Sequence, residues 1–277
     1  MPLAGGLYYS LYEGGNRDQK PVVLIHGAGS SHLCWPAEMR RLSGYTVYAI
    51  DLPGHGRSQG VGFQSVAAYC GAIIDFLAAL DLYRAYFVGH SLGGAIALNL
   101  ALDYSPHVEG LGLIASGAHF DLPADMLDYL SSPTSAPVGL QILQQRSFSP
   151  NTRPDLVNRS LEALKATRSS VLYGDWTACA QFDVRARAAE VTAPAYIAVG
   201  SQDQLTPPAQ ARFLAGSLPG ARLDVIPEAG HLVMLEQPAA VARGLQVFLQ
   251  QAADWQANIS LPVEIKKQDR ARLQGGE

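Results

Sequence analysis

Residues 88–94 read VGHSLGG, in which Ser91 stands between two glycines that each lie two positions away. Residues 85–91 form an apolar run that predicts a buried strand, and residues 92–104 carry apolar side chains at helical spacing. Ser91 is therefore expected on the turn between a strand and a helix, at the C-terminal edge of a sheet. Open α/β sheets hold their active sites at that edge.

Gly89 and Gly93 explain how so sharp a turn is built. The serine is expected in a strained backbone conformation, and a Cβ atom two residues away would collide with the neighbouring strand or helix. The pattern G-x-S-x-G is the nucleophile elbow, which exposes a serine hydroxyl for attack. A chance match in a chain this long has a probability on the order of 0.1, so the strand-turn-helix context carries the prediction.

The rest of the chain alternates strand-like runs with helical stretches. The apolar runs lie at 20–27, 45–51, 85–91, 108–116, 193–200 and 221–228, and helical spacing is found at 63–80, 92–104, 207–217 and 236–252. This alternation predicts an α/β fold, with a parallel sheet covered by helices on both faces. Residues 6–15 predict an antiparallel arm that adds one or two strands at an edge.

Residues 118–191 interrupt the alternation. They contain no strand-like run, and their helical spacing predicts an inserted cap of three to five helices. A pair of long crossover helices is the alternative, although more than 70 residues exceeds what one crossover requires. The predicted organisation is a core of 1–117 and 192–253, a cap of 118–191, and a tail of 254–277 that is dispensable for chemistry.

Composition limits the classes of partner. The net charge of -4 over 277 residues provides no basic surface for nucleic acid, whose phosphates are bound by Lys and Arg. The apolar runs are shorter than the roughly 20 residues that a membrane helix needs, and the N-terminus lacks the pattern of a signal peptide. We therefore expect a cytoplasmic protein with no membrane partner. Cys34, Cys70 and Cys179 are widely spaced and are interpreted as buried or incidental thiols.

A serine nucleophile needs a histidine base and a carboxylate that orients it. The chain order serine, acid, histidine leaves three candidate bases, His107, His119 and His231. His231 directly follows the last predicted strand, from which a loop can return to the elbow, and is the predicted base. The other two are expected at the surface or at the mouth of the cap.

Asp203 is the predicted acid. It lies three residues beyond the end of the strand at 193–200, with Gly200 allowing the turn. Asp121 is the competing candidate, because it follows the strand that ends at Ala115. Both carboxylates come after a strand that leads to the same edge of the sheet.

Attack on a carbonyl creates an oxyanion, which needs two donors already directed at it. One predicted donor is the backbone N–H of Leu92, next to the nucleophile at a helix N-terminus. The other is the N–H of Ala28, in the glycine-containing loop after the strand at 20–27. His26 is expected to shape that loop and Trp35 to pack against a helix, so neither is assigned to the reaction.

Five stretches together resemble the α/β-hydrolase superfamily, in particular its capped, esterase- and lipase-like serine hydrolases. They are HGAGSSHLCW (26–35), DLPGHGRS (51–58), VGHSLGG (88–94), VGSQDQLTP (199–207) and AGHLVMLEQP (229–238). The resemblance implies a mostly parallel eight-stranded sheet flanked by helices, a Ser-His-Asp triad, and no cofactor or metal. It also implies a structural role for His55 and Arg57.

Several activities share these motifs. Cleavage of a carboxylic ester or lactone through an acyl-enzyme is the favoured prediction, with a neutral, mainly apolar small-molecule substrate. The alternatives are carbon-carbon hydrolysis, acyl transfer and cofactor-free haloperoxidase or perhydrolase chemistry. A binding or receptor protein that keeps the triad is the remaining class. The sequence leaves the oligomeric state open.

Overall fold

The computed structural model describes residues 2–15, 19–123, 125–132 and 134–259. Most of the predicted tail, residues 260–277, lies outside this part of the chain. Residues 254–259 continue the last helix, α10 (Pro238–Ile259).

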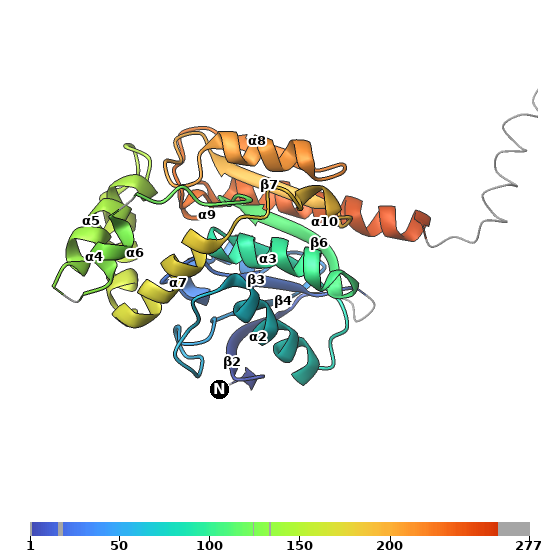
Figure 1. The fold of residues 1–277 in the computed structure, drawn as a ribbon. Helices are drawn as coiled ribbons and strands as arrows, with labels where there is room; N and C mark the ends of the chain where they lie inside the picture. Colours follow the sequence, from blue (N-terminus) through green and yellow to red (C-terminus); the bar gives the residue numbers. More distant parts are fainter. Residues whose placement is uncertain (1, 16–18, 124, 133, 260–277) are drawn as a thin grey trace, which may run out of the picture.

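An eight-stranded, mostly parallel sheet forms the centre of the molecule (Figure 1). Its strands in chain order are β1 (Leu3–Ala4), β2 (Leu7–Glu13), β3 (Val22–Ile25), β4 (Thr46–Ile50), β5 (Ala85–His90), β6 (Val108–Ile114), β7 (Ala195–Gly200) and β8 (Arg222–Ile226). The spatial order is β1-β2-β4-β3-β5-β6-β7-β8, and only β1 and β2 run antiparallel to their neighbours. The predicted fold class and its edge arm are both confirmed.

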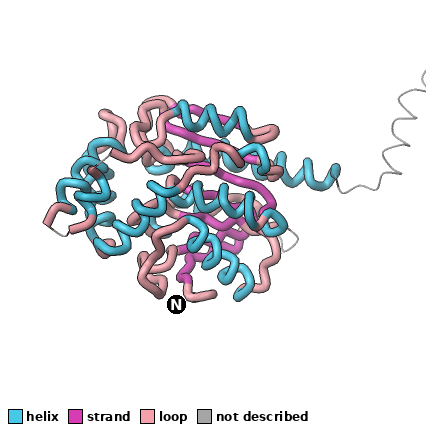
Figure 2. The backbone as a smooth tube through the Cα atoms, in the orientation of Figure 1, coloured by secondary structure: helices cyan, strands magenta, loops and turns pink. Residues whose placement is uncertain are grey.

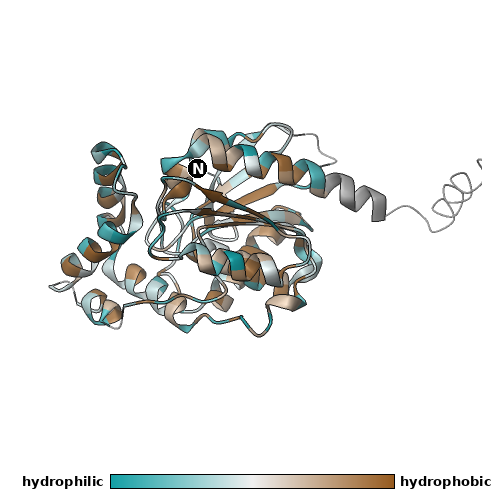
Figure 3. Ribbon diagram, turned by 90° about the horizontal axis from the view of Figure 1, so that it is seen from above, coloured by the Kyte–Doolittle hydropathy of each residue, from teal (hydrophilic) through white to brown (hydrophobic). Residues whose placement is uncertain are grey.

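Helices cover both faces of the sheet, as the alternation predicted. One apolar core includes buried side chains of α2 (Val66–Ala79), α3 (Leu92–Asp103) and α8 (Pro208–Ser217). The other face is covered by α1 (Ala37–Arg40), α9 (Val233–Glu236) and α10. Figure 3 shows the hydrophobic strands between these two layers. Every residue of β5 is buried, so the strand that leads to Ser91 is held rigidly at the centre.

In the part of this segment that the structure describes, four α-helices follow β6 before the chain returns to the sheet. They are α4 (Met126–Leu130), α5 (Ala136–Ser147), α6 (Pro154–Lys165) and α7 (Ser169–Gln181). Figure 1 shows α4, α5 and α6 grouped beside the sheet, with α7 leading back, and Figure 2 shows this group as almost entirely helical. The segment leaves and re-enters the core at one place, because the Ala118 carbonyl accepts a 2.8 Å bond from the Val184 amide.

Candidate active site

Ser91 occupies a strained turn between β5 and α3. Its φ of 52° lies in the region that non-glycine residues rarely adopt, and such strain is often found where a side chain has to be presented. The Ser91 N–H donates to the Ile114 carbonyl (3.0 Å) and the Ser116 hydroxyl donates to the Ser91 carbonyl (2.9 Å). The end of β6 (Val108–Ile114) and the residues just after it therefore hold the serine in this conformation.

The two glycines of the elbow have no room for a side chain. A Cβ atom on Gly89 would lie 2.0 Å from the Gly93 carbonyl oxygen, at the start of α3. One on Gly93 would lie 2.1 Å from the Ile25 carbonyl oxygen, at the end of β3. The predicted collisions with helix and strand are thus both present.

Asp203 and His231 meet from the loops after β7 and β8. The Nδ1 atom of His231 lies 2.9 Å from Oδ2 and 3.1 Å from Oδ1 of Asp203, and both side chains are buried. A carboxylate only accepts hydrogen bonds, so Nδ1 carries the proton. In the neutral ring, Nε2 then keeps the lone pair that a general base requires.

Thr206 supports the carboxylate, a role that the sequence interpretation missed. Its hydroxyl donates to Asp203 Oδ2 (2.8 Å), while the amides of Leu205 and Thr206 both donate to Oδ1 (2.9 Å each). Burial opposes ionisation of Asp203, but the ring of His231 and these donors hold the pKa of Asp203 below its usual value. The spacing D-x-x-T was the available signal, since Asp side chains commonly bond backbone N–H groups two and three residues on.

His90, directly before the nucleophile, holds the backbone of His231. Its Nε2 lies 3.0 Å from the His231 carbonyl oxygen, which can only accept, so Nε2 is protonated. The centroids of the two rings are 4.9 Å apart. Burial above all, together with the ring of His231, lowers the pKa of His90 to about 3, so the ring is neutral. The His231 amide donates to the Ser147 carbonyl at the end of α5 (2.9 Å).

A cavity of about 520 Å³ brings together Ser91, His231 and Ala28, all of which line it. Leu92, the second predicted oxyanion donor, is the first residue of α3. Among the described residues, the structure has no hydrogen bond between the Ser91 hydroxyl and the His231 ring. Bonds of this kind are often long in enzymes without substrate.

Apolar side chains from the core and from the inserted helices surround the cavity. The insertion contributes Leu143, Phe148, Leu156, Leu161, Ala163, Leu164 and Trp176. Arg159 is the one Lys, Arg, Asp or Glu side chain among the described lining residues, and it is paired with Asp155 (3.1 Å). A volume of this size is ordinary for a small-molecule site.

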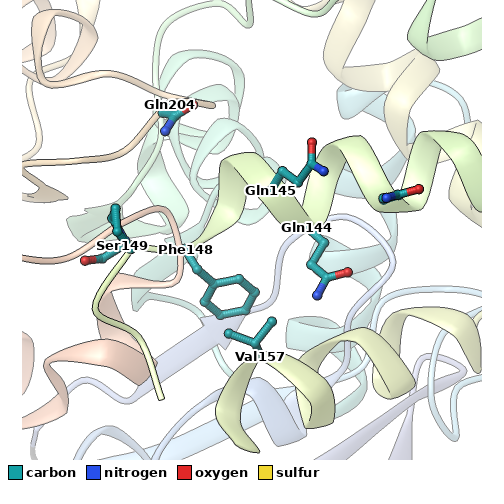
Figure 4. Close-up of a pocket in the computed structure, with 8 residues that line it drawn as sticks. Gln144, Gln145, Phe148, Ser149, Val157 and Gln204 are labelled. Carbon is teal, nitrogen blue, oxygen red and sulfur yellow. The ribbon is translucent and has the colours of Figure 1, made fainter. Parts of the chain in front are cut away.

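A second hollow, of about 400 Å³, adjoins this cavity through two shared residues, Gln144 and Phe148. Its other lining residues are Gln141, Gln145, Ser149, Pro150, Val157 and Gln204. Figure 4 shows Gln144 and Gln145 projecting from α5, with Val157 on α6 and Gln204 on the loop that also carries Asp203. This hollow is therefore uncharged and rich in amides.

The competing candidates lie elsewhere. The side chain of Asp121 is 75% exposed and contacts His119 and Gln210, not His231. His107 bonds to the Tyr83 carbonyl at the far end of β6. Neither His107 nor His119 is among the residues that line the cavity.

The residues that were given structural roles have structural partners. His26 accepts from the Leu52 amide (2.9 Å), and Trp35 is fully buried in the core under α1 and α10. The Arg57 amide donates to the Asp51 carboxylate (2.9 Å). His55 lies 2.8 Å from Asp175, a residue that the sequence did not single out.

The three cysteines are free thiols. Burial raises the pKa of Cys34 and of Cys70 to about 12 and that of Cys179 well above its usual value, so none is a reactive thiolate at neutral pH.

Within the described residues, no cluster of His, Cys, Asp and Glu side chains has the arrangement of a metal site. In the same part of the chain, no helix combines the length and apolar character needed to cross a bilayer.

The fold and the site together define an α/β protein with a serine at a strand-to-helix elbow and a buried His-Asp pair beside it. Residues 22–244 match the alpha/beta hydrolase family, and the chain belongs to that family. It is therefore an enzyme of the hydrolase class that the motifs predicted.

Individual relatives agree with this assignment. The chain is 30% identical to a pimeloyl-[acyl-carrier protein] methyl ester esterase of Neisseria meningitidis, over 83% of this chain and 93% of the relative. A hydrolase from Pseudomonas aeruginosa superposes with a TM-score of 0.79 at 27% identity, over 88% of this chain and 94% of that one. Est816, described as an N-acyl homoserine lactone degrading enzyme, superposes with a TM-score of 0.75 at 26% identity, over 87% of this chain and 96% of that one.

Proposed function

We propose that the protein hydrolyses a carboxylic ester or lactone through an acyl-enzyme on Ser91. The observation that carries the proposal is that Ser91 and His231 line the same cavity, with Nδ1 of His231 bonded to the buried Asp203 carboxylate. An ester-cleaving relative and a lactone-degrading relative, both above 25% identity, support the same class of substrate.

The proposed reaction has two halves. His231 Nε2 takes the proton of the Ser91 hydroxyl as Oγ attacks the carbonyl carbon, and then gives that proton to the departing alkoxide oxygen. The same nitrogen then deprotonates a water molecule, which attacks the acyl carbon, and it returns that proton to Ser91 Oγ as the acid is released. The amides of Ala28 and Leu92 stabilise the oxyanion in both halves.

The apolar lining indicates a neutral, mainly apolar acyl group, held between the elbow and the inserted helices. In this proposal residues 118–191 act as a cap, because α5, α6 and α7 supply much of the cavity wall. We expect p-nitrophenyl esters of increasing chain length to raise kcat/KM until the cavity is filled. A preference for dicarboxylate or phosphorylated substrates would contradict the assignment of the acyl group.

The nucleophile is tested by Ser91→Ala, which removes the hydroxyl and adds no bulk to the elbow. Hydrolysis of p-nitrophenyl acetate and labelling by a fluorophosphonate should both be lost, while circular dichroism and the melting temperature stay close to the parent. A variant that still takes up the label would show that another residue is the nucleophile.

A further inference from the structure

The loop that carries the proposed oxyanion donor needs to be held in place. This oxyanion loop, residues 26–31, joins β3 to a short 3₁₀ turn that begins at His32. Ala28 stands in it between two glycines, and Gly29 has a φ of +66°, which glycine adopts without strain. Oxyanion stabilisation depends on donors that are already fixed before the reaction, so the contacts that immobilise this loop bear directly on catalysis.

A buried carboxylate from the insertion holds the loop. Asp175 lies on α7 and is 0% exposed. Its Oδ2 accepts a 2.7 Å bond from the Gly29 amide and a 2.8 Å bond from His55 Nε2, and its Oδ1 accepts from the Tyr69 hydroxyl. Three donors thus satisfy one buried carboxylate, and they come from the oxyanion loop, the loop after β4, and α2.

The buried Asp175 carboxylate faces the ring of His55. Burial disfavours the protonated form of His55, but the hydrogen bond and the charge of Asp175 outweigh it and raise the pKa of His55 above its usual value. Both ring nitrogens of His55 face acceptors, since Nε2 lies 2.8 Å from Asp175 Oδ2 and Nδ1 lies 3.1 Å from the Pro53 carbonyl oxygen. An ionised carboxylate is a stronger acceptor than a neutral group. The bond to the Gly29 amide is therefore a short, charge-assisted one.

The carbonyl group of Gly29 is also held by the insertion. The Thr167 hydroxyl, between α6 and α7, donates to the Gly29 carbonyl oxygen at 2.7 Å. A Cβ atom on Gly29 would lie 2.5 Å from Leu164 and 2.6 Å from Leu172, so the inserted helices lie directly on the loop. Both polar groups of Gly29 are thus bonded to the insertion.

We propose that Asp175 is the positioning residue of the oxyanion loop, which makes α7 part of the machinery that fixes the Ala28 amide toward the reacting carbonyl. The inference rests on the proposed function, because it assumes that Ala28 donates to an oxyanion. Asp175 is not among the residues that line the cavity. It acts through the peptide that follows Ala28, so its loss changes the binding of the transition state more than that of the ester.

The test compares three substitutions by kcat, KM and the affinity for a trifluoromethyl ketone, which forms a tetrahedral adduct with an active serine. Asp175→Ala removes the acceptor for Gly29. Asp175→Asn keeps an oxygen toward Gly29 and His55 and turns its amide toward the hydroxyl of Tyr69, which accepts as well as donates. Tyr69→Phe is the matched control, because it removes a bond to Asp175 and leaves the bond to Gly29.

We expect Asp175→Ala to lower kcat and ketone affinity by roughly 10- to 100-fold, somewhat less than deletion of an oxyanion donor, with KM changed less than about 3-fold. Asp175→Asn should recover most of the loss and Tyr69→Phe should stay within about 3-fold of the parent. Equal losses in Asp175→Ala and Tyr69→Phe, or a folded Asp175→Ala with parental kcat, would overturn the proposal.

Thr167→Val decides the matter if Asp175→Ala does not fold. It removes only the bond to the Gly29 carbonyl, and a several-fold fall in kcat at constant KM is expected, whereas parental kcat would refute the proposal. The parent enzyme is first tested for ester hydrolysis and for fluorophosphonate labelling of Ser91. Failure there rejects the proposed function, while an active, labelled parent with insensitive variants rejects only the role of Asp175.

Discussion

The position of one proton on His231 decides whether the proposed triad works. Asp203 accepts from Nδ1 and so leaves Nε2 free to take the proton of Ser91. In Asp203→Asn the side-chain amide can instead donate to Nδ1, which moves the ring proton to Nε2. By analogy with other triads, kcat on a short ester should fall by about 10⁴-fold, with little change in the melting temperature.

Asp121→Asn is the matched control for that substitution. It makes the same chemical change on a carboxylate that is largely exposed and bonded to Gln210 and His119. Its kcat should remain within a few-fold of the parent. The reverse ranking of the two variants would move the acid to the loop after β6.

At the scale of elements, the elbow depends on close approach between β3, β5 and α3. Gly93→Ala places a methyl group 2.1 Å from the Ile25 carbonyl oxygen, so strand or helix has to move. Overpacking of this kind typically costs 1–3 kcal/mol. We expect a lower urea midpoint and a slower reaction with fluorophosphonate, because Ser91 moves with the start of α3.

Gly71→Ala tests whether the Gly93 effect is steric. Gly71 lies inside α2, and a Cβ atom there would meet no atom within 4 Å. Alanine is favoured over glycine in a helix by roughly 0.5–1 kcal/mol, so this variant should be more stable and equally active. A loss of stability in both variants would show that the clash at Gly93 is not the cause.

The inserted helices hold both of the loops that the proposed chemistry requires. The Ser147 carbonyl at the end of α5 accepts from the His231 amide, and Glu236 in α9 accepts from the amides of Ser149 and Gly230. At the other side, Asp175 and α7 hold the oxyanion loop. An insertion attached in this way does more than shape the cavity, because its displacement would disturb base and oxyanion donors together.

At the scale of the whole molecule, the sequence predicted the structural features that depend on residues close together in the chain. The elbow, the parallel strands and the positions of Asp203 and His231 follow from local patterns and from the order in which strands deliver their loops. Asp175 was missed because its partners lie 146, 120 and 106 residues away. In an otherwise helical pattern, nothing marks one acidic residue as buried.

The sequence likewise did not predict which side chains line the cavity. Apolar spacing predicted the inserted helices, but it did not distinguish the side chains that face the cavity from those that pack the insertion. Leu143 and Trp176 line the cavity, whereas Met126 and Leu130 are buried in the core without lining it. Which face of each helix turns to the elbow depends on how α4 to α7 pack on the sheet.

The stability of the whole chain should depend on pH through two histidines that are buried in neutral form. Burial is the main cause that lowers the pKa of His26 to about 4 and that of His90 to about 3, from 6.5. Between pH 6.5 and 4 the unfolded chain therefore binds more protons at these sites than the folded chain does. The free energy of unfolding should fall as the pH falls, by up to about 1.4 kcal/mol per pH unit for each histidine.

Other groups act outside the range from pH 6 to 5. The raised pKa of His55 contributes stability that is fully present below pH 6.5 and is lost only as the pH rises through its folded pKa. The lowered pKa values of Asp51 and Asp203 matter below about pH 5, where the unfolded carboxylates begin to take up protons. The slope between pH 6 and 5 is therefore assigned to His26 and His90.

Urea unfolding of the parent and of His90→Gln at pH 6, 5.5 and 5 measures this slope, in a range where His55 contributes little. Glutamine can still donate to the His231 carbonyl but does not titrate, so the variant should lose about half of the pH dependence whatever its stability at pH 6. The remaining half belongs to His26, whose Nε2 has to stay unprotonated to accept from the Leu52 amide. A variant with the parental slope would show that His90 takes up its proton in the folded protein, and the neutral ring described beside His231 would then be wrong.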